Sequence, residues 1–209
     1  MSYNRPYLQE VFPSYDYHNP LRPWENHIKA ENGPRNCGWQ MMAFHYFWCE
    51  KLKEEGSVGL SLNIPNLPFC NLVSNEPGVG QLFSDFRSVH RLVNPRSYPL
   101  IIASAAISFL SCNKEIQSKY CDGGEVAQAI KDWMTILAPG GVLAAVIMDE
   151  KMPFYEGRTL KGQQNIVHAW TATQFERAVL SQLVDTVEIV EYDTFHNGCS
   201  FNLVLTPRG

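Results

Sequence analysis

The stretch "ILAPGGVLAAVIMDE", residues 136–150, combines a helix end, a tight turn and a buried strand. Upstream of it, apolar residues at a spacing of three to four predict an amphipathic helix over residues 125–137. Residues 138–141 (Ala-Pro-Gly-Gly) end this helix, because proline cannot continue it and glycine adopts the backbone conformation of a helix end. The uniformly apolar residues 142–148 then predict a strand that is buried on both faces. The buried face of the helix holds Val126, Ile130, Trp133 and Leu137.

Helices and strands alternate on the N-terminal side of this segment. Apolar residues at helical spacing predict a helix that starts at Asn36, a potential cap, and runs to Gly56. Because strands that alternate with helices form a mostly parallel sheet with helices on both sides, the sequence predicts a doubly wound α/β domain. The predicted strands are residues 58–62, 70–75, 99–104 and, most weakly, 81–86.

The C-terminal third departs from this alternation. A helix is predicted to begin near Thr171, where two capping boxes overlap. Strands at 187–192 and 200–206 flank Asn197-Gly198, a pair that forms tight hairpin turns at little cost. The sheet is therefore expected to end in an antiparallel hairpin. The two boxes are Thr171 with Gln174 and Thr173 with Glu176, and the predicted buried face holds Phe175, Val179 and Leu183.

Bulk composition favours a single soluble domain. The chain has 209 residues, of which 45% are hydrophobic and 18% charged, so it can bury a substantial core. A net charge of −4 and dispersed basic residues disfavour a nucleic-acid partner. The longest apolar run, residues 98–110, is shorter than the roughly 20 residues that span a bilayer. Six scattered cysteines and the lack of a signal-peptide pattern predict a reducing, cytoplasmic location, and no metal-ligand spacing is present.

Residues 1–36 differ from the rest of the chain. They contain five prolines, which prevent a long helix, and many aromatic side chains, which argue against a purely solvated tail. We interpret them as an irregular arm that packs on its own domain or on a protein partner, and we assign residues 37–209 to the α/β domain. The aromatic residues of the arm include Tyr3, Tyr7, Tyr15, Tyr17 and Trp24.

Three segments together resemble one known family, the class I S-adenosylmethionine-dependent methyltransferases. Residues 137–141 match the family's Leu-x-Pro-Gly-Gly turn before the fifth strand. Residues 96–110 are similar to its fourth strand, with Pro99 in place of the usual aspartate, and residues 168–179 resemble the segment before its last large helix. The resemblance covers residues 37–207. It implies a seven-stranded sheet whose last strand runs antiparallel, with S-adenosylmethionine as the cofactor.

The sequence departs from this family where the cofactor loop is expected. The family has a glycine-rich loop after its first strand, but here residues 62–65 read Leu-Asn-Ile-Pro. Asn63 tolerates a positive φ and can replace one glycine, whereas Pro65 removes a backbone N–H. The resemblance therefore implies a degenerate glycine-rich loop.

The family's other cofactor positions have matches in this chain. By position, Glu76 would accept hydrogen bonds from the ribose hydroxyls, Asp85 would face the adenine amino group, and Phe86 would pack on the adenine ring. Glu76 as an exposed turn residue and Asp85 as a cap are the structural alternatives. The full predicted cofactor-binding set is Ser61, Asn63, Glu76, Asp85, Phe86 and Ser104.

An acceptor pocket is expected after the fifth strand, although no catalytic residue can be named. His168 there is a candidate base, but we favour its packing with Trp170 at the start of the following helix. The residues after Ser104 lack the Asn/Asp-Pro-Pro-Tyr form, which disfavours methylation of nucleobases. The acceptor would be a small molecule or a protein. The pocket candidates are Asp149, Glu150, Tyr155 and His168.

Two functions remain open from the sequence. The first is an S-adenosylmethionine-dependent methyltransferase with a divergent loop, which Glu76, Asp85 and the intact frame favour. The second is a methyltransferase-like pseudoenzyme that serves as a structural or interaction component of a larger assembly, which the loop favours. In the second case the N-terminal arm would dock on a protein partner. Nicotinamide chemistry is disfavoured, because the dinucleotide-binding glycine fingerprint is missing.

Overall fold

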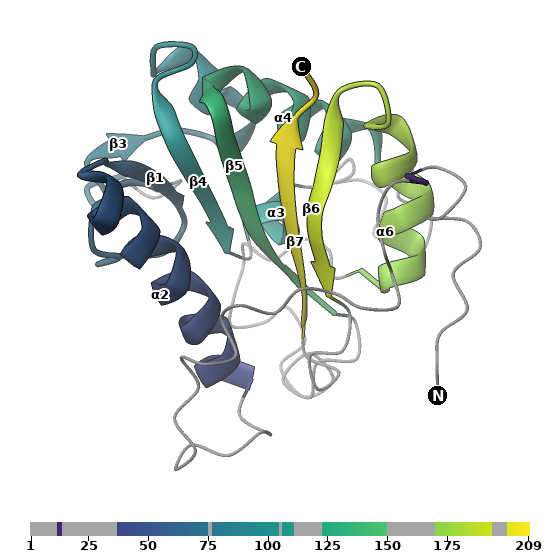
Figure 1. Cartoon of the computed structure of the whole chain (residues 1–209), viewed down its shortest axis with the longest axis horizontal. Coiled ribbons are helices and arrows are strands. Elements are labelled where there is room, and N and C mark those ends of the chain that lie inside the picture. Colours follow the sequence, from purple (N-terminus) through teal and green to yellow (C-terminus); the bar gives the residue numbers. More distant parts are fainter. Residues whose placement is uncertain are drawn as a thin grey trace.

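A seven-stranded sheet forms the centre of the protein, with strand order β3-β2-β1-β4-β5-β7-β6 (Figure 1). The computed structural model describes residues 12–13, 37–74, 77–104, 106–110, 123–149, 170–193 and 200–209. The first five strands pair in parallel, and β7 runs antiparallel to both β5 and β6. The strands are β1 (Gly59–Leu62), β2 (Cys70–Ser74), β3 (Leu82–Phe83), β4 (Tyr98–Ser104), β5 (Leu137–Met148), β6 (Val187–Asp193) and β7 (Ser200–Pro207).

The C-terminal hairpin inserts its second strand into the sheet. A methyltransferase-like sheet is expected to place residues 200–206 between 187–192 and 142–148, and β7 does lie between β6 and β5, which confirms this expectation. As a result β5 has a neighbour on each edge, β4 on one and β7 on the other. Residues 143–147 of β5 are fully buried, which explains why this strand is apolar on both faces.

Helices cover both faces of the sheet (Figure 1). On one face, α2 (Cys37–Glu55) packs against Leu100 and Ile102 of β4. On the other, Ile101 and Ala103 belong to a larger cluster built with the remaining helices. This alternation along β4 divides the core into two halves. The helices of the second face are η3 (Phe86–Arg91), α4 (Gly124–Ile136), α6 (Ala172–Ala178) and η4 (Leu180–Gln182), and α3 (Ala106–Phe109) follows β4.

The connection between β1 and β2 is unusually short. These neighbouring strands are parallel, yet only residues 63–69 join them, and those residues form turns without a helix. Parallel neighbours normally need a crossover of about a dozen residues or more, usually with a helix. Positive φ angles at Asn63 (79°), Asn66 (61°) and Phe69 (60°) make the tight path possible. Leu67 of this connection packs in the α2 cluster and helps to cover that face.

The turn between α4 and the body of β5 has the expected backbone. Gly140 has a φ of 75°, which confirms the predicted positive φ in the Gly140-Gly141 pair. The helix ends at Ile136, and the pairing with β4 shifts register between Leu137 and Val142. Residues 138–141 therefore form a bulge that carries the chain from the helix into the sheet. All four predicted apolar residues of the α4 face are buried.

The start of α6 confirms the first of the two predicted capping boxes. The Thr171 hydroxyl accepts a hydrogen bond from the Gln174 N–H, and the Gln174 side chain accepts one from the Thr171 N–H, both at 3.1 Å. The Trp170 and Phe175 rings meet edge to face beside this cap. Phe12, which is 2% exposed, belongs to the same core cluster, so the N-terminal arm packs on its own domain at this point. The aromatic arm residues named above, Asn36 and Asn197-Gly198 lie outside the described residues.

The buried imidazole of His45 predicts a loss of stability in acid. His45 lies on α2 with no exposed surface, and neither ring nitrogen has a hydrogen-bond partner. Burial lowers its pKa to about 4, whereas an unfolded chain has a histidine pKa of about 6.5. The unfolded state therefore binds more protons between these values, and the free energy of unfolding should fall by about 3 kcal/mol as the pH drops from 7 to 4.

Urea denaturation of the wild type and of His45→Phe across this pH range measures the effect. Since His45→Phe removes the titrating group and keeps an aromatic ring, its stability should vary less with pH. Equal pH dependence in the two proteins would rule out His45 as the source.

Candidate functional site

The candidate site lies at the carboxyl ends of β1 and β4. These strands are neighbours, and the chain proceeds from β1 toward β2 on one side and from β4 toward β5 on the other. In open α/β sheets, ligands bind in the crevice where the strand order reverses in this way. The structure brings Ser61, Asn63 and Ser104 together here, as expected from their places at the ends of two predicted strands.

The Asn63 side chain crosses this crevice. Its Nδ2 donates a hydrogen bond to the Ser104 carbonyl at 3.4 Å, and its backbone N–H donates to the Val73 carbonyl at 3.1 Å. One residue in a left-handed conformation thus ties together the ends of β1, β2 and β4. The buried Ser61 hydroxyl donates to the Ile64 carbonyl at 2.9 Å, which holds the loop against β1. The Asn63 carboxamide and the Ser61 hydroxyl are therefore both engaged with neighbouring backbone carbonyls.

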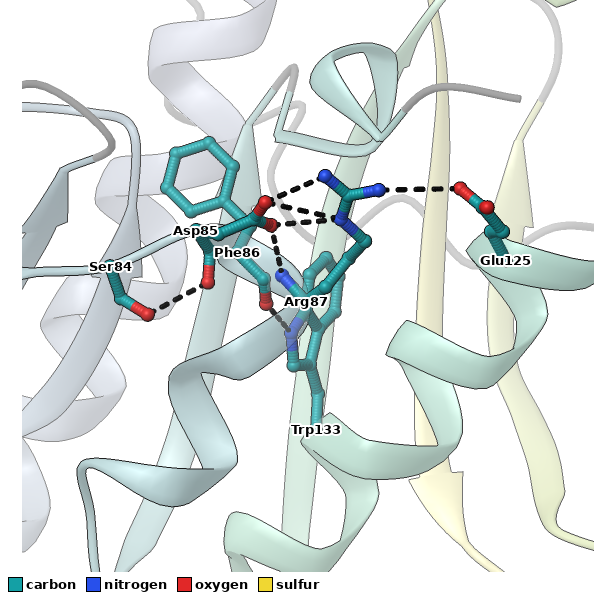
Figure 2. Close-up of polar contacts among 6 residues, drawn as sticks. All are labelled: Ser84, Asp85, Phe86, Arg87, Glu125 and Trp133. Carbon is teal, nitrogen blue, oxygen red and sulfur yellow. Dashed lines mark hydrogen bonds and ion pairs between the residues drawn. The ribbon is translucent and has the colours of Figure 1, made fainter. Parts of the chain in front are cut away.

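Asp85 caps η3 and pairs with Arg87 (Figure 2). One carboxylate oxygen, Oδ1, accepts the Arg87 N–H at 2.9 Å, and Oδ2 contacts the guanidinium at 2.6 Å. The guanidinium also reaches the Glu125 carboxylate on α4 at 3.3 Å. The hydrogen bond to Asp85 raises the pKa of Arg87, so the guanidinium stays charged. The capping alternative for Asp85 is thus the role visible in the structure.

Phe86 is the first residue of η3 and belongs to the larger core cluster, and its carbonyl faces Trp133 of α4 (Figure 2). The residue is 2% exposed, and its carbonyl accepts a hydrogen bond from the Trp133 Nε1–H at 2.8 Å. Its ring therefore has no exposed face on which an adenine could stack. Phe86, which was expected to stack on an adenine, instead anchors η3 to α4 through its carbonyl. It is buried here because it packs in the same apolar cluster as Trp133.

The predicted acceptor-pocket residues are described only in part. Asp149 directly follows β5 and forms an isolated parallel bridge with Trp170. The backbone N–H of the buried Trp170 continues this pairing and donates to the Met148 carbonyl at 3.0 Å. Glu76, Glu150, Tyr155 and His168 lie outside the described residues.

A pocket of about 670 Å³ lies at the opposite, amino-terminal edge of the sheet. It is lined by the two residues before β1, by the starts of β2, β3 and β4 and by the segment after η3, and none of its lining residues is charged. Inside it, the Asn71 side chain donates a hydrogen bond to the Tyr98 hydroxyl at 3.3 Å. Sequence reasoning missed this pocket, because its lining residues come from separate segments that carry no motif.

Two further classes of site receive no support from the described part of the chain. Among those residues, no group of three or more histidine, cysteine, aspartate or glutamate side chains is arranged to hold a metal ion. No helix in the same part is long and apolar enough to cross a membrane.

Solved structures share this fold. The chain is similar to a DUF574 family protein from Streptomyces avermitilis, with a TM-score of 0.52 and 13% identity over 97% of this chain and 96% of that one. It is also similar to an S-adenosylmethionine-dependent methyltransferase from Clostridium acetobutylicum, with a TM-score of 0.50 and 12% identity over 79% of this chain and 91% of that one. No protein-family model and no curated protein matches the sequence. The fold is therefore that of the class I methyltransferases.

Substitutions at Asp85 test whether it acts as a helix cap. Asp85→Ala should lower the free energy of unfolding by about 1 kcal/mol, because the Arg87 N–H loses its acceptor. Asp85→Asn keeps a capping oxygen and should retain most of the stability. Glu125→Gln is the matched control, since it weakens only an exposed ion pair, and its effect should stay below about 1 kcal/mol. Urea denaturation measures all three, and a neutral Asp85→Ala would exclude the capping role.

Proposed function

We propose that this chain is a methyltransferase-fold protein that serves as an interaction component rather than as an S-adenosylmethionine-dependent catalyst. The observation that carries the proposal is the contact between the loop that follows β1 and the end of β4. There the helix-free connection of residues 63–69 replaces a cofactor loop, and the Asn63 side chain reaches the Ser104 carbonyl. The degenerate loop predicted from the sequence and the tight path of the chain agree on this point.

Loss of backbone donors supports the proposal. In doubly wound folds, a glycine-rich turn after the first strand leads into a helix whose N-terminal N–H groups hold the anionic part of the ligand. Residues 63–69 provide no helix, Pro65 has no N–H, and the Asn63 N–H is bound to Val73. Charge-assisted hydrogen bonds contribute roughly 1.5–3 kcal/mol each. Losing two of them weakens binding by about two to four orders of magnitude.

The residues expected at the adenine end support the same conclusion. The Asp85 carboxylate is bound to Arg87 and to the start of η3. The Phe86 ring lies in the core and is 2% exposed. A cofactor at this edge would have to displace an ion pair at one position and would find no exposed ring at the other. These residues therefore do not fit S-adenosylmethionine.

A protein partner is the proposed ligand of the interaction component. Val58 and Leu92 line the pocket at the amino-terminal edge, and each is 49% exposed. Apolar side chains that gather around a hollow mark surfaces for association. Because no charged residue lines the pocket, the partner is expected to present uncharged groups there.

The rival function is a methyltransferase with a rebuilt loop. It is favoured by the methyltransferase-like fold. It is also favoured by the polar residues at the carboxyl edge of the sheet, which are Ser61, Asn63, Ser104 and Asp149. In that case Glu76 is the proposed ribose ligand, as the sequence resemblance implies. Cofactor binding separates the two functions.

Calorimetric titration with S-adenosylmethionine and S-adenosylhomocysteine tests the proposal directly. The wild type should show no saturable binding up to millimolar concentrations, since the donors for the methionine carboxylate are missing. Asn63→Gly opens the crevice without restoring a helix, and it should not bind either.

Saturable binding by the wild type would overturn the proposal and establish the rival. A loss of tenfold or more in Glu76→Ala, about 1.4 kcal/mol, would then locate the ribose at Glu76. Glu55→Ala, an exposed change at the end of α2, is the matched control for that variant.

Charge substitution at the pocket tests the interaction half of the proposal. Leu92→Asp places a carboxylate at the rim of an uncharged pocket, so complexes recovered from cells by crosslinking should decrease at least tenfold. Val190→Asp changes a similarly exposed apolar residue on β6 and should leave them unchanged. Circular dichroism confirms that both variants fold. Equal recovery from the two variants would exclude this pocket as the docking surface.

A further inference from the structure

Two cysteines from different elements meet in the core behind β1. Cys49 lies on α2, Cys70 is the first residue of β2, and their thiols are joined by a hydrogen bond. Both are free cysteines that belong to the α2 cluster. Cys49 is 1% exposed, whereas Cys70 is partly accessible to solvent.

The residue opposite this pair is a glycine for a steric reason. A Cβ on Gly59 would lie 3.3 Å from the Cys70 sulfur and 2.8 Å from Cδ1 of Leu52. Leu52 is one helical turn beyond Cys49 on α2, so the helix and the strand meet at Gly59. The absence of a side chain there leaves room for the Cys70 sulfur beside α2.

We propose that Cys49 and Cys70 form a modification site at which a small disulfide, such as oxidised glutathione, reversibly converts the two thiols into a disulfide between α2 and β2. This inference is independent of the proposed function, because it concerns neither the crevice nor the amino-edge pocket.

The reaction proceeds by two thiol–disulfide exchanges. In the first, the Cys70 sulfur attacks one sulfur of the small disulfide while its proton passes along the hydrogen bond to the Cys49 thiolate, which forms a mixed disulfide at Cys70 and releases one small thiolate. In the second, the Cys49 thiolate attacks the Cys70 sulfur, which forms the protein disulfide and releases the second small thiolate. The two protons lost by the protein thiols protonate the two released thiolates. The protein is oxidised by two electrons, and the small disulfide is reduced by the same two.

Accessibility and electrostatics assign different roles to the two sulfurs. Cys70 is the accessible thiol, so it is the one that a bulky oxidant reaches first. The hydrogen bond that the Cys70 thiol donates lowers the pKa of Cys49. The same hydrogen bond, together with burial, raises the pKa of Cys70. Cys49 can therefore take the Cys70 proton in the first step, and its contact with the Cys70 sulfur places it to resolve the mixed disulfide in the second.

The new bond would enclose the helix-free connection. The cross-link between residues 49 and 70 closes a loop that contains the end of α2, all of β1 and residues 63–69. The sulfurs need only move from hydrogen-bond contact to a bond of about 2.05 Å, and both flanking elements already pack in one cluster. Closing a loop of this length restricts the unfolded chain. The melting temperature of the oxidised protein should therefore rise by about 5–10 °C.

Treatment of the full chain with oxidised glutathione tests the proposal. Reduced protein is incubated with the reagent, free thiols are alkylated, and the digest is mapped by mass spectrometry without reduction. We expect a linked pair of peptides that carries Cys49 and Cys70, together with the rise in melting temperature. Dithiothreitol should reverse both effects. Persistent glutathione on Cys70 without the linked peptides, or two fully alkylated thiols, would overturn the proposal.

Single substitutions separate the two roles. In Cys49→Ser, oxidation should stop at the glutathione adduct on Cys70, and in Cys70→Ser the buried Cys49 should stay reduced. Cys37→Ser removes a cysteine at the other end of α2, and it should form the cross-link as the wild type does. A linked pair that involves Cys37 in place of Cys49 would contradict the assignment. The wild-type peptide map decides the matter even where a variant folds poorly.

Discussion

Seven residues must carry the chain from the carboxyl end of β1 back to the amino end of β2. This constraint determines the geometry of the carboxyl edge of the sheet around β1. The four residues of β1 extend about 13 Å at 3.3 Å per residue. Seven extended residues span at most about 24 Å, whereas seven helical residues advance only about 10 Å. The return path leaves no length for a helix once the chain has turned at both ends. Left-handed residues make those turns, and Asn63 is the first of them.

Folding and function meet at Asn63. An asparagine tolerates the left-handed backbone that the turn requires, and its carboxamide also reaches the end of β4. The residue that allows the short connection therefore also links the carboxyl ends of β1 and β4, where this class of fold binds ligands. Leu67 fills core space beside α2 from the same connection. The connection is therefore part of the packed structure on the α2 side of the sheet.

The order of helices and strands could be predicted from the sequence because the local sequence patterns agreed with one another. The buried strand at 142–148 and the cap at Thr171 needed no long-range information, while the position of β7 in the sheet followed only from the family resemblance. The short spacing between the first two predicted strands was visible as well, although its meaning depends on knowing that they are parallel neighbours. The contact between Asn63 and Ser104 joins residues 41 positions apart, which periodicity cannot predict. The choice between cap and ligand for Asp85 depended on where the Arg87 side chain lies.

The placement of β7 between β5 and β6 also affects how the protein is made. During translation, β5 leaves the ribosome about 60 residues before the end of β7, and at roughly 5–20 residues per second this delay lasts about 3–12 s. Throughout that interval, one edge of an entirely apolar strand has no partner. Unpaired apolar edges attract other nascent chains and holdase chaperones. The sheet therefore closes late in synthesis, and nascent chains paused between β5 and β7 are the species most prone to aggregate.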